Sequence, residues 1–158
     1  QAKDDSVYFI HNDVGYNYRL NNLCAAVGLA QMETLKKKIK RKKSINKYYQ
    51  SKINDLGEFY ISPTPNYCES NYWLNILRLK NNKKYTNKEI IKYFKRNSVD
   101  VRAVWYPNHM QKKFLKFQNY KIEKAVKIIK NSVCLPSSTN LSIRDQDKVI
   151  NLLKKFIN

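Results

Sequence analysis

Two polar clusters in the 158-residue sequence contain residue types that could bind or act on a ligand. In the first, over residues 11–20, Gly15 allows a backbone turn that other residues resist, and Asn17 and Arg19 come just ahead of an expected helix start. Amide and guanidinium donors beside a helix N-terminus suit a phosphate group. A capped turn with polar groups on the surface would show the same spacing, and spacing alone favours that interpretation.

The second cluster follows the end of an expected strand and contains Arg102, Trp105 and His109. A loop of this kind can stack a ring and bind a charged group. A packed tryptophan with exposed polar neighbours explains the pattern equally well. The Walker, GxGxxG, HExxH and GxSxG motifs are all absent from the sequence, and no cysteine and histidine share the local signature of a nucleophile pair.

The net charge of +19, from 31 Lys+Arg against 12 Asp+Glu, permits a stand-alone basic module that binds nucleic acid. However, lysine far outnumbers arginine, and asparagine, isoleucine and tyrosine are also abundant, as they are in proteins from AT-rich genes. Readers of nucleic acid favour arginine because it binds bidentately. Biased composition is therefore the preferred explanation, and the nucleic-acid module is kept as the alternative function.

The three cysteines, Cys24, Cys68 and Cys134, are far apart and form no CxxC pair. We therefore predict neither a metal site nor a disulfide framework, and expect buried free thiols in a reducing compartment. No apolar run is long enough to cross a bilayer, and no signal peptide is visible. The expectation is a soluble, cytoplasmic protein.

The elements that must position the two clusters alternate along the chain. Two long helices are expected over residues 22–54, the first capped by Asn21 or Asn22, and a turn-rich segment over residues 61–71 marks a boundary. From residue 72 onward the expected order is strand 72–79, a helix opened by a Thr86–Glu89 capping box, strand 99–105, loop 106–120, helix 122–130, strand 132–135 and a helix capped by Ser142 and Asp145. This order predicts an α/β or α+β layer domain with helices on a sheet of three or four strands.

The clusters also contain a family pattern. The sequence has G-Y-N-Y-R-L over residues 15–20, A-A-x-G-L-A-Q over 25–31, R-x-x-W-x-P-x-H-x-Q over 102–111 and C-L-P-S-S over 134–138. These motifs, in this order, resemble the C-terminal part of the DegT/DnrJ/EryC1/StrS sugar aminotransferases over nearly the whole chain. The resemblance is strongest to members that aminate UDP-linked 4-keto sugars on the route to bacillosamine or legionaminic acid-type sugars.

This resemblance implies the small C-terminal domain of an aspartate-aminotransferase-like (type I) fold, preceded by long helices. Residues 1–60 would be the lead-in and long helices that pack on a large cofactor domain, and residues 61–158 the small α/β domain. The implied cofactor is pyridoxal phosphate, the implied amino donor glutamate, and the implied acceptor a nucleotide-linked keto sugar in polysaccharide biosynthesis. A homodimer with active sites at the subunit interface is also implied.

Site roles carry over from the matching motifs. Asn17 would contact the cofactor phosphate of the neighbouring subunit, with Arg19 as a further anion contact. His109 would face the sugar nucleotide, and Trp105 and Arg102 are weaker candidates for substrate contact. The family's Schiff-base lysine lies upstream of Gln1, and none of the 25 lysines present sits in its sequence context. We therefore assign no catalytic residue to the chain, and expect it to be a fragment that is inactive alone.

Overall fold

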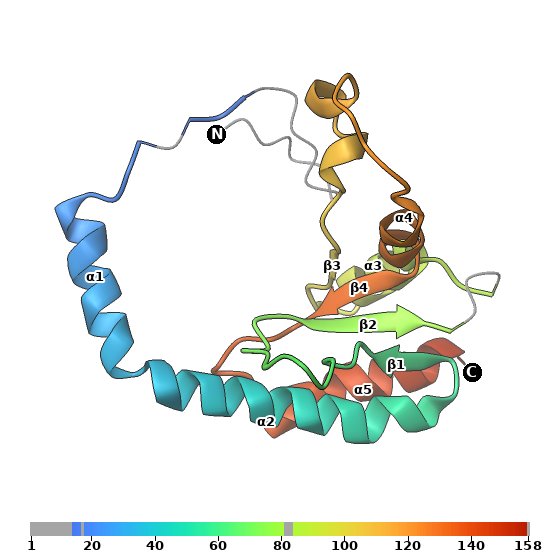
Figure 1. The fold of residues 1–158 in the computed structure, drawn as a ribbon. Coiled ribbons are helices and arrows are strands. Elements are labelled where there is room, and N and C mark those ends of the chain that lie inside the picture. The colour runs from blue at the N-terminus through green and yellow to red at the C-terminus, as the bar shows by residue number, and fades with distance from the viewer. Residues whose placement is uncertain (1–13, 17, 81–83, 158) are drawn as a thin grey trace.

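The computed structural model describes residues 14–16, 18–80 and 84–157. Figure 1 shows a long helical N-terminal part leading into a layer of helices and a four-stranded sheet. The elements, in chain order, are α1 (Asn22–Glu33), α2 (Leu35–Ile53), η1 (Asn54–Leu56), β1 (Phe59–Ile61), β2 (Asn75–Leu79), α3 (Asn87–Arg96), β3 (Arg102–Ala103), η2 (Asn108–Met110), η3 (Lys112–Phe114), α4 (Glu123–Lys130), β4 (Ser132–Leu135) and α5 (Ile143–Ile157). Within the described part of the chain, none of the helices combines the length and apolar character needed to cross a bilayer.

The sheet has the strand order β1-β2-β4-β3, and each of its three pairings is antiparallel. β4 lies between β2 and β3, with Val133 opposite Leu77 on one side and Ala103 on the other. All four residues of β4 are buried, as is usual for a short central strand covered on both faces. The predicted helix-and-sheet layer with three or four strands is confirmed.

One contiguous apolar core joins the sheet to α2, α3 and α5. Tyr49 of α2, Phe59 of β1, Phe94 of α3 and Leu153 of α5 are all fully buried. Each such side chain contributes about 1.5–3 kcal/mol through removal of its apolar surface from water. α2 and α5 run side by side (Figure 1), where the Tyr48 hydroxyl of α2 donates a hydrogen bond of 2.6 Å to Asp147 of α5.

The buried positions of α2 explain its orientation. Ile45, Asn46, Tyr49 and Ile53 lie on one face of the helix, because they are separated by about one or two helical turns. The lysine-rich first half of α2 is exposed or half-buried. The second half of α2 therefore packs into the same core as the sheet, while the division into residues 1–60 and 61–158 remains a prediction.

The two side-chain caps predicted within the helix-and-sheet layer are confirmed. The Thr86 hydroxyl accepts from the Glu89 amide (3.3 Å), while the Glu89 carboxylate accepts from the Thr86 amide (2.8 Å), which forms a capping box at the start of α3. At the start of α5, the Ser142 hydroxyl accepts from the Asp145 amide at 3.1 Å. In both places a short polar side chain satisfies amide donors that the helix leaves unpaired.

Strand limits differ from the prediction. β2 begins at Asn75 rather than residue 72, because Tyr72 has a φ of 50° and the Asn71 side chain accepts from the Trp73 amide, so the backbone is still turning there. The strand expected over residues 99–105 is only β3, since it pairs with β4 for two residues. β1 was not predicted. It follows Gly57, whose φ of 76° turns the chain back toward the sheet.

The expectation of three buried thiols is wrong for two of them. Cys134 is buried in β4, whereas Cys24 and Cys68 are exposed. Cys24 lies on α1, and Cys68 lies in the turn-rich segment before β2, where its thiol contacts the Pro65 carbonyl at 3.5 Å. An apolar or mixed sequence setting does not bury a side chain when the whole element stands away from the core.

α1 is such an element. It projects away from the sheet (Figure 1), and none of its residues is buried. Its start is capped by the Asn21 side chain, which accepts from the Cys24 amide at 2.8 Å, as predicted. Large apolar side chains on and beside it are 61–80% exposed, namely Leu20, Leu23, Val27, Leu29 and Met32. A helix with this composition that no other described residue covers is typical of an interface with another polypeptide surface.

Candidate functional site

A pair of tryptophans lies where the second cluster meets the sheet. Trp73 precedes β2 and Trp105 follows β3, and their ring centroids are 5.5 Å apart with the planes tilted by 37°. Trp73 is 64% exposed and Trp105 is 43% exposed. The pair therefore presents aromatic surface to the outside instead of filling the core.

The backbone that carries Trp73 is held by Lys42 of α2. The Lys42 ammonium donates hydrogen bonds to the Trp73 carbonyl at 3.1 Å and to the Ser137 carbonyl. Burial lowers the pKa of Lys42. One ammonium group thus joins α2 to the segments that flank β2 and β4.

A second connection runs through buried amides. The Ser137 hydroxyl accepts from the Asn75 amide (3.1 Å) and from the Asn75 side chain (2.8 Å), and donates to the Leu135 carbonyl at 3.0 Å. The Asn46 side chain donates to the Asn75 side-chain oxygen at 2.8 Å. Asn75 is fully buried, and its polar atoms are bonded, as a buried amide requires. The C-L-P-S-S motif therefore has a structural role here, with Ser137 locking the start of β2.

Arg102 lies on β3 and is exposed. Its guanidinium group forms an ion pair with Asp100, at 2.9 Å from Nη2 and 3.0 Å from Nε to the same carboxylate oxygen. This contact fixes a cation at the surface of the strand that leads to Trp105. Because the pair is exposed to water, it contributes little to stability and leaves the guanidinium accessible to an anion.

His109 lies in the single turn η2, which starts after Pro107. The Met110 amide donates to the Pro107 carbonyl at 3.0 Å and closes this turn. His109 is half-buried, and Gln111 directly after the turn is buried. The predicted loop with short helical turns is therefore present, and it carries Trp105 and His109 on one continuous segment after β3.

The phosphate-type cluster lies apart from the sheet. Arg19 is exposed, with a φ of 79°, directly before α1, and Asn17 lies outside the described residues. Every described residue from Val14 to Lys37 is exposed. A pyridoxal phosphate site needs an enclosed, positioned lysine amine, so the described residues do not build one.

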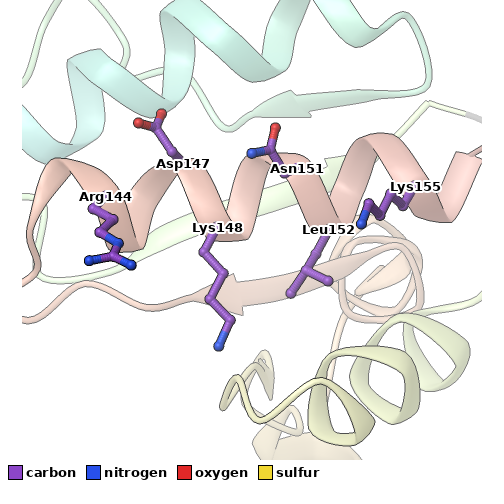
Figure 2. A pocket seen from close by; sticks show the side chains of 6 residues that line it. All are labelled: Arg144, Asp147, Lys148, Asn151, Leu152 and Lys155. Atoms are coloured by element: carbon purple, nitrogen blue, oxygen red, sulfur yellow. The ribbon is translucent and has the colours of Figure 1, made fainter.

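Other hollows lie in the described part of the chain, among them one between α2 and residues 64–72 that is lined by polar side chains of both segments. Figure 2 shows another on α5, lined by Arg144, Asp147, Lys148, Asn151, Leu152 and Lys155. Asp147 points toward α2, where Tyr48 binds it, while Arg144 and Lys148 lie on the other side of α5. These side chains come from a single helix and diverge, so they form a solvated basic surface.

Sequence comparison identifies the family. The DegT/DnrJ/EryC1/StrS aminotransferase family matches residues 1–154. The chain belongs to this family. The predicted family and the aspartate-aminotransferase-like fold are therefore confirmed. Members of the family depend in general on pyridoxal phosphate.

Similar proteins agree with this assignment. EpsN of Bacillus subtilis, named as a pyridoxal phosphate-dependent aminotransferase, is 30% identical over 97% of this chain and 40% of its own length. GDP-perosamine synthase of Vibrio cholerae is 29% identical over 94% of this chain and 40% of its own length. The solved structure of DesI with its TDP-sugar product superposes with a TM-score of 0.78 at 17% identity, covering 89% of this chain and 36% of that one. The chain thus spans about 40% of the length of its curated relatives.

The three predicted substrate residues lie close together along the chain. Arg102 is on β3, and Trp105 and His109 are on the segment that follows it. Sequence reasoning missed Trp73, Asn75 and Lys42. The sequence places Trp73 in the predicted strand of residues 72–79. The alternation of side chains along a strand does not reveal a contact with a distant loop. The available signal was Asn75, which with Arg78 is one of two strongly polar residues in the stretch of residues 72–79.

Proposed function

We propose that the chain is the C-terminal portion of an aminotransferase that transfers an amino group from glutamate to a nucleotide-linked keto sugar in the cytoplasm. The family match over residues 1–154 carries this proposal. Relatives named GDP-perosamine synthase and a fold neighbour bound to a TDP-sugar product support a nucleotide sugar as the substrate class. Pyridoxal phosphate, when bound in the complete enzyme, supplies the electron sink for amino transfer.

In this proposal the chain does not carry the Schiff-base lysine. Its role is to bind and position the cofactor phosphate and the sugar nucleotide. Asn17 and Arg19 contact the cofactor phosphate of the neighbouring subunit in a homodimer. Arg102, Trp105 and His109 contact the sugar nucleotide. The exposed Arg102 guanidinium suits a diphosphate, because its donors bind phosphate oxygens bidentately.

The exposed apolar surface of α1 supports the proposed domain arrangement. Residues 1–60 would include the helix that packs on the large cofactor domain, and residues 61–158 form the small domain. Leu23 and Val27 are one helical turn apart and both exposed, so their cover must come from outside the described residues. The product would be an amino sugar for a polysaccharide.

The proposal is tested by complementation. The chain alone, supplied with pyridoxal phosphate, glutamate and a UDP-linked 4-keto sugar, is expected to give no enzymatic formation of 2-oxoglutarate. Adding EpsN from which the matching 40% has been removed is expected to restore turnover. Arg19→Ala should lower the restored rate about 10-fold or more, since it removes an ionic contact worth about 1.5–3 kcal/mol. Arg144→Ala, on the exposed surface of α5, is the matched control.

Turnover by the chain alone would contradict its proposed inactivity. A stable complex without turnover would contradict the aminotransferase role itself. The affinity of the chain for unrelated DNA, measured at several salt concentrations, distinguishes the aminotransferase proposal from the alternative function. Tight binding with a steep dependence on salt would indicate a basic nucleic-acid module. We expect weak binding.

A further inference from the structure

We propose that Trp73 and Trp105 together form a stacking platform for the base of the nucleotide-linked sugar, with Trp73 as a binding residue beside Trp105. This inference rests on the proposed function and assigns it a base subsite. It starts from exposure. Tryptophan is highly buried on average in folded proteins, yet both tryptophans of this chain are exposed and in contact with each other. Paired exposed indoles lose the benefit of burial and are typical of recognition surfaces.

The ring geometry suits a planar guest. The planes are tilted by 37°, so the two indoles do not form a closed parallel stack. With 64% of Trp73 exposed, most of its surface remains available to a further ring. Every nucleobase has a π-face, and stacking on an aromatic side chain is tolerant of base identity. A platform of this kind would accept the base whichever nucleotide the sugar carries.

Hydrogen bonds also fix the backbone that carries Trp73. The Trp73 carbonyl accepts from Lys42, and the Trp73 amide donates to the Asn71 side chain at 3.0 Å. Two residues later, Asn75 is locked by Ser137 and Asn46. A side chain on a fixed backbone loses less conformational entropy when it binds, which favours a preformed binding surface.

Charge favours a nucleotide over an apolar polypeptide partner. The segment that leads to Trp105 begins with the exposed Arg102, whose guanidinium is paired with Asp100, and the Lys42 ammonium donates to the Trp73 carbonyl. In contrast, the uncovered surface of α1 is made of aliphatic side chains. Exposed indole rings on segments that carry Arg102 or bind Lys42 match a base joined to a diphosphate, whereas the aliphatic α1 surface matches another hydrophobic surface.

The chain provides its own reporter, because its only two tryptophans are these two. Selective excitation of tryptophan in the 158-residue chain should show saturable quenching by UDP, GDP or dTDP. Ribose 5-phosphate and inorganic pyrophosphate, which lack a base, should not quench at the same concentrations. Trp73→Ala leaves Trp105 as the reporter and should weaken nucleotide binding about 10- to 100-fold, whereas Trp73→Phe should retain most of it. Tyr67→Ala removes an exposed aromatic outside the pair and is the matched control.

The outcomes separate this inference from the proposed function. In the complemented enzyme, Trp73→Ala should raise the KM for the nucleotide sugar about 10-fold with little change in kcat. If restored turnover is insensitive to Trp73→Ala and the nucleotides do not quench, the platform is wrong while the aminotransferase role stands. Quenching without restored turnover would keep the base site and overturn the role. Quenching only by the truncated EpsN polypeptide would make the pair part of a protein interface and overturn the platform.

Discussion

Lys42 and Lys43 are neighbours on α2 with opposite surroundings. Lys42 donates to the Trp73 and Ser137 carbonyls from a half-buried position, whereas Lys43 forms an ion pair with Glu69 at the surface. Lys42→Met should lower the free energy of unfolding by about 1–3 kcal/mol, because two carbonyl acceptors lose a charged donor. Lys43→Met should have little effect, as exposed ion pairs are screened by water. Urea unfolding followed by circular dichroism measures both, and equal losses would show that the Lys42 contacts do not stabilise the fold.

At the scale of the element, the capping box of α3 should contribute to the free energy of unfolding in a way that depends on pH. Thr86→Ala should lower the free energy of unfolding by about 1 kcal/mol, and Thr86→Ser should retain most of it. Hydrogen bonds from Thr86 hold the pKa of Glu89 below its usual value. The cap therefore stabilises the fold above the ordinary glutamate pKa, and this contribution is lost as pH falls through the lower folded-state value. Glu89→Gln should remove that acid dependence, and an unchanged profile in urea unfolding at several pH values would contradict it.

Helix ends and strand limits differ in how far the sequence predicts them. The caps at Thr86 and Ser142 were predicted because the partners lie three residues away and the bonds are local. β1 was missed and β3 was predicted too long, since a strand exists only where a distant partner pairs with it. Long-range contacts between side chains are missed for the same reason. The sequence predicts Trp105 as a site residue, but it does not predict the contact of Trp105 with Trp73. The error at Cys24 arose because no local pattern reveals that a whole helix stands away from the core, and Cys68 lies in an exposed turn.

At the scale of the whole molecule, α1 and the body, meaning α2 together with the sheet, α3 and α5, have separable roles. The core is built from α2, the sheet, α3 and α5, and α1 contributes no buried residue to it. Replacing Leu23, Val27 and Met32 of α1 by serine should therefore leave the free energy of unfolding nearly unchanged. Unfolding in urea measures this, and a large loss of stability would show that α1 packs on the body in solution.

The same exposed surface should make the chain associate. Leu23 and Val27 lie one turn apart on α1, are 80% and 61% exposed, and form part of an aliphatic surface that water solvates poorly. We expect concentration-dependent self-association in sedimentation velocity, and the double substitution Leu23→Glu with Val27→Glu should give a monomer. Tyr67→Glu, at a residue that is also exposed but lies outside α1, should leave association unchanged. A chain that stays monomeric at every concentration would mean that the exposed surface of α1 does not by itself drive pairing.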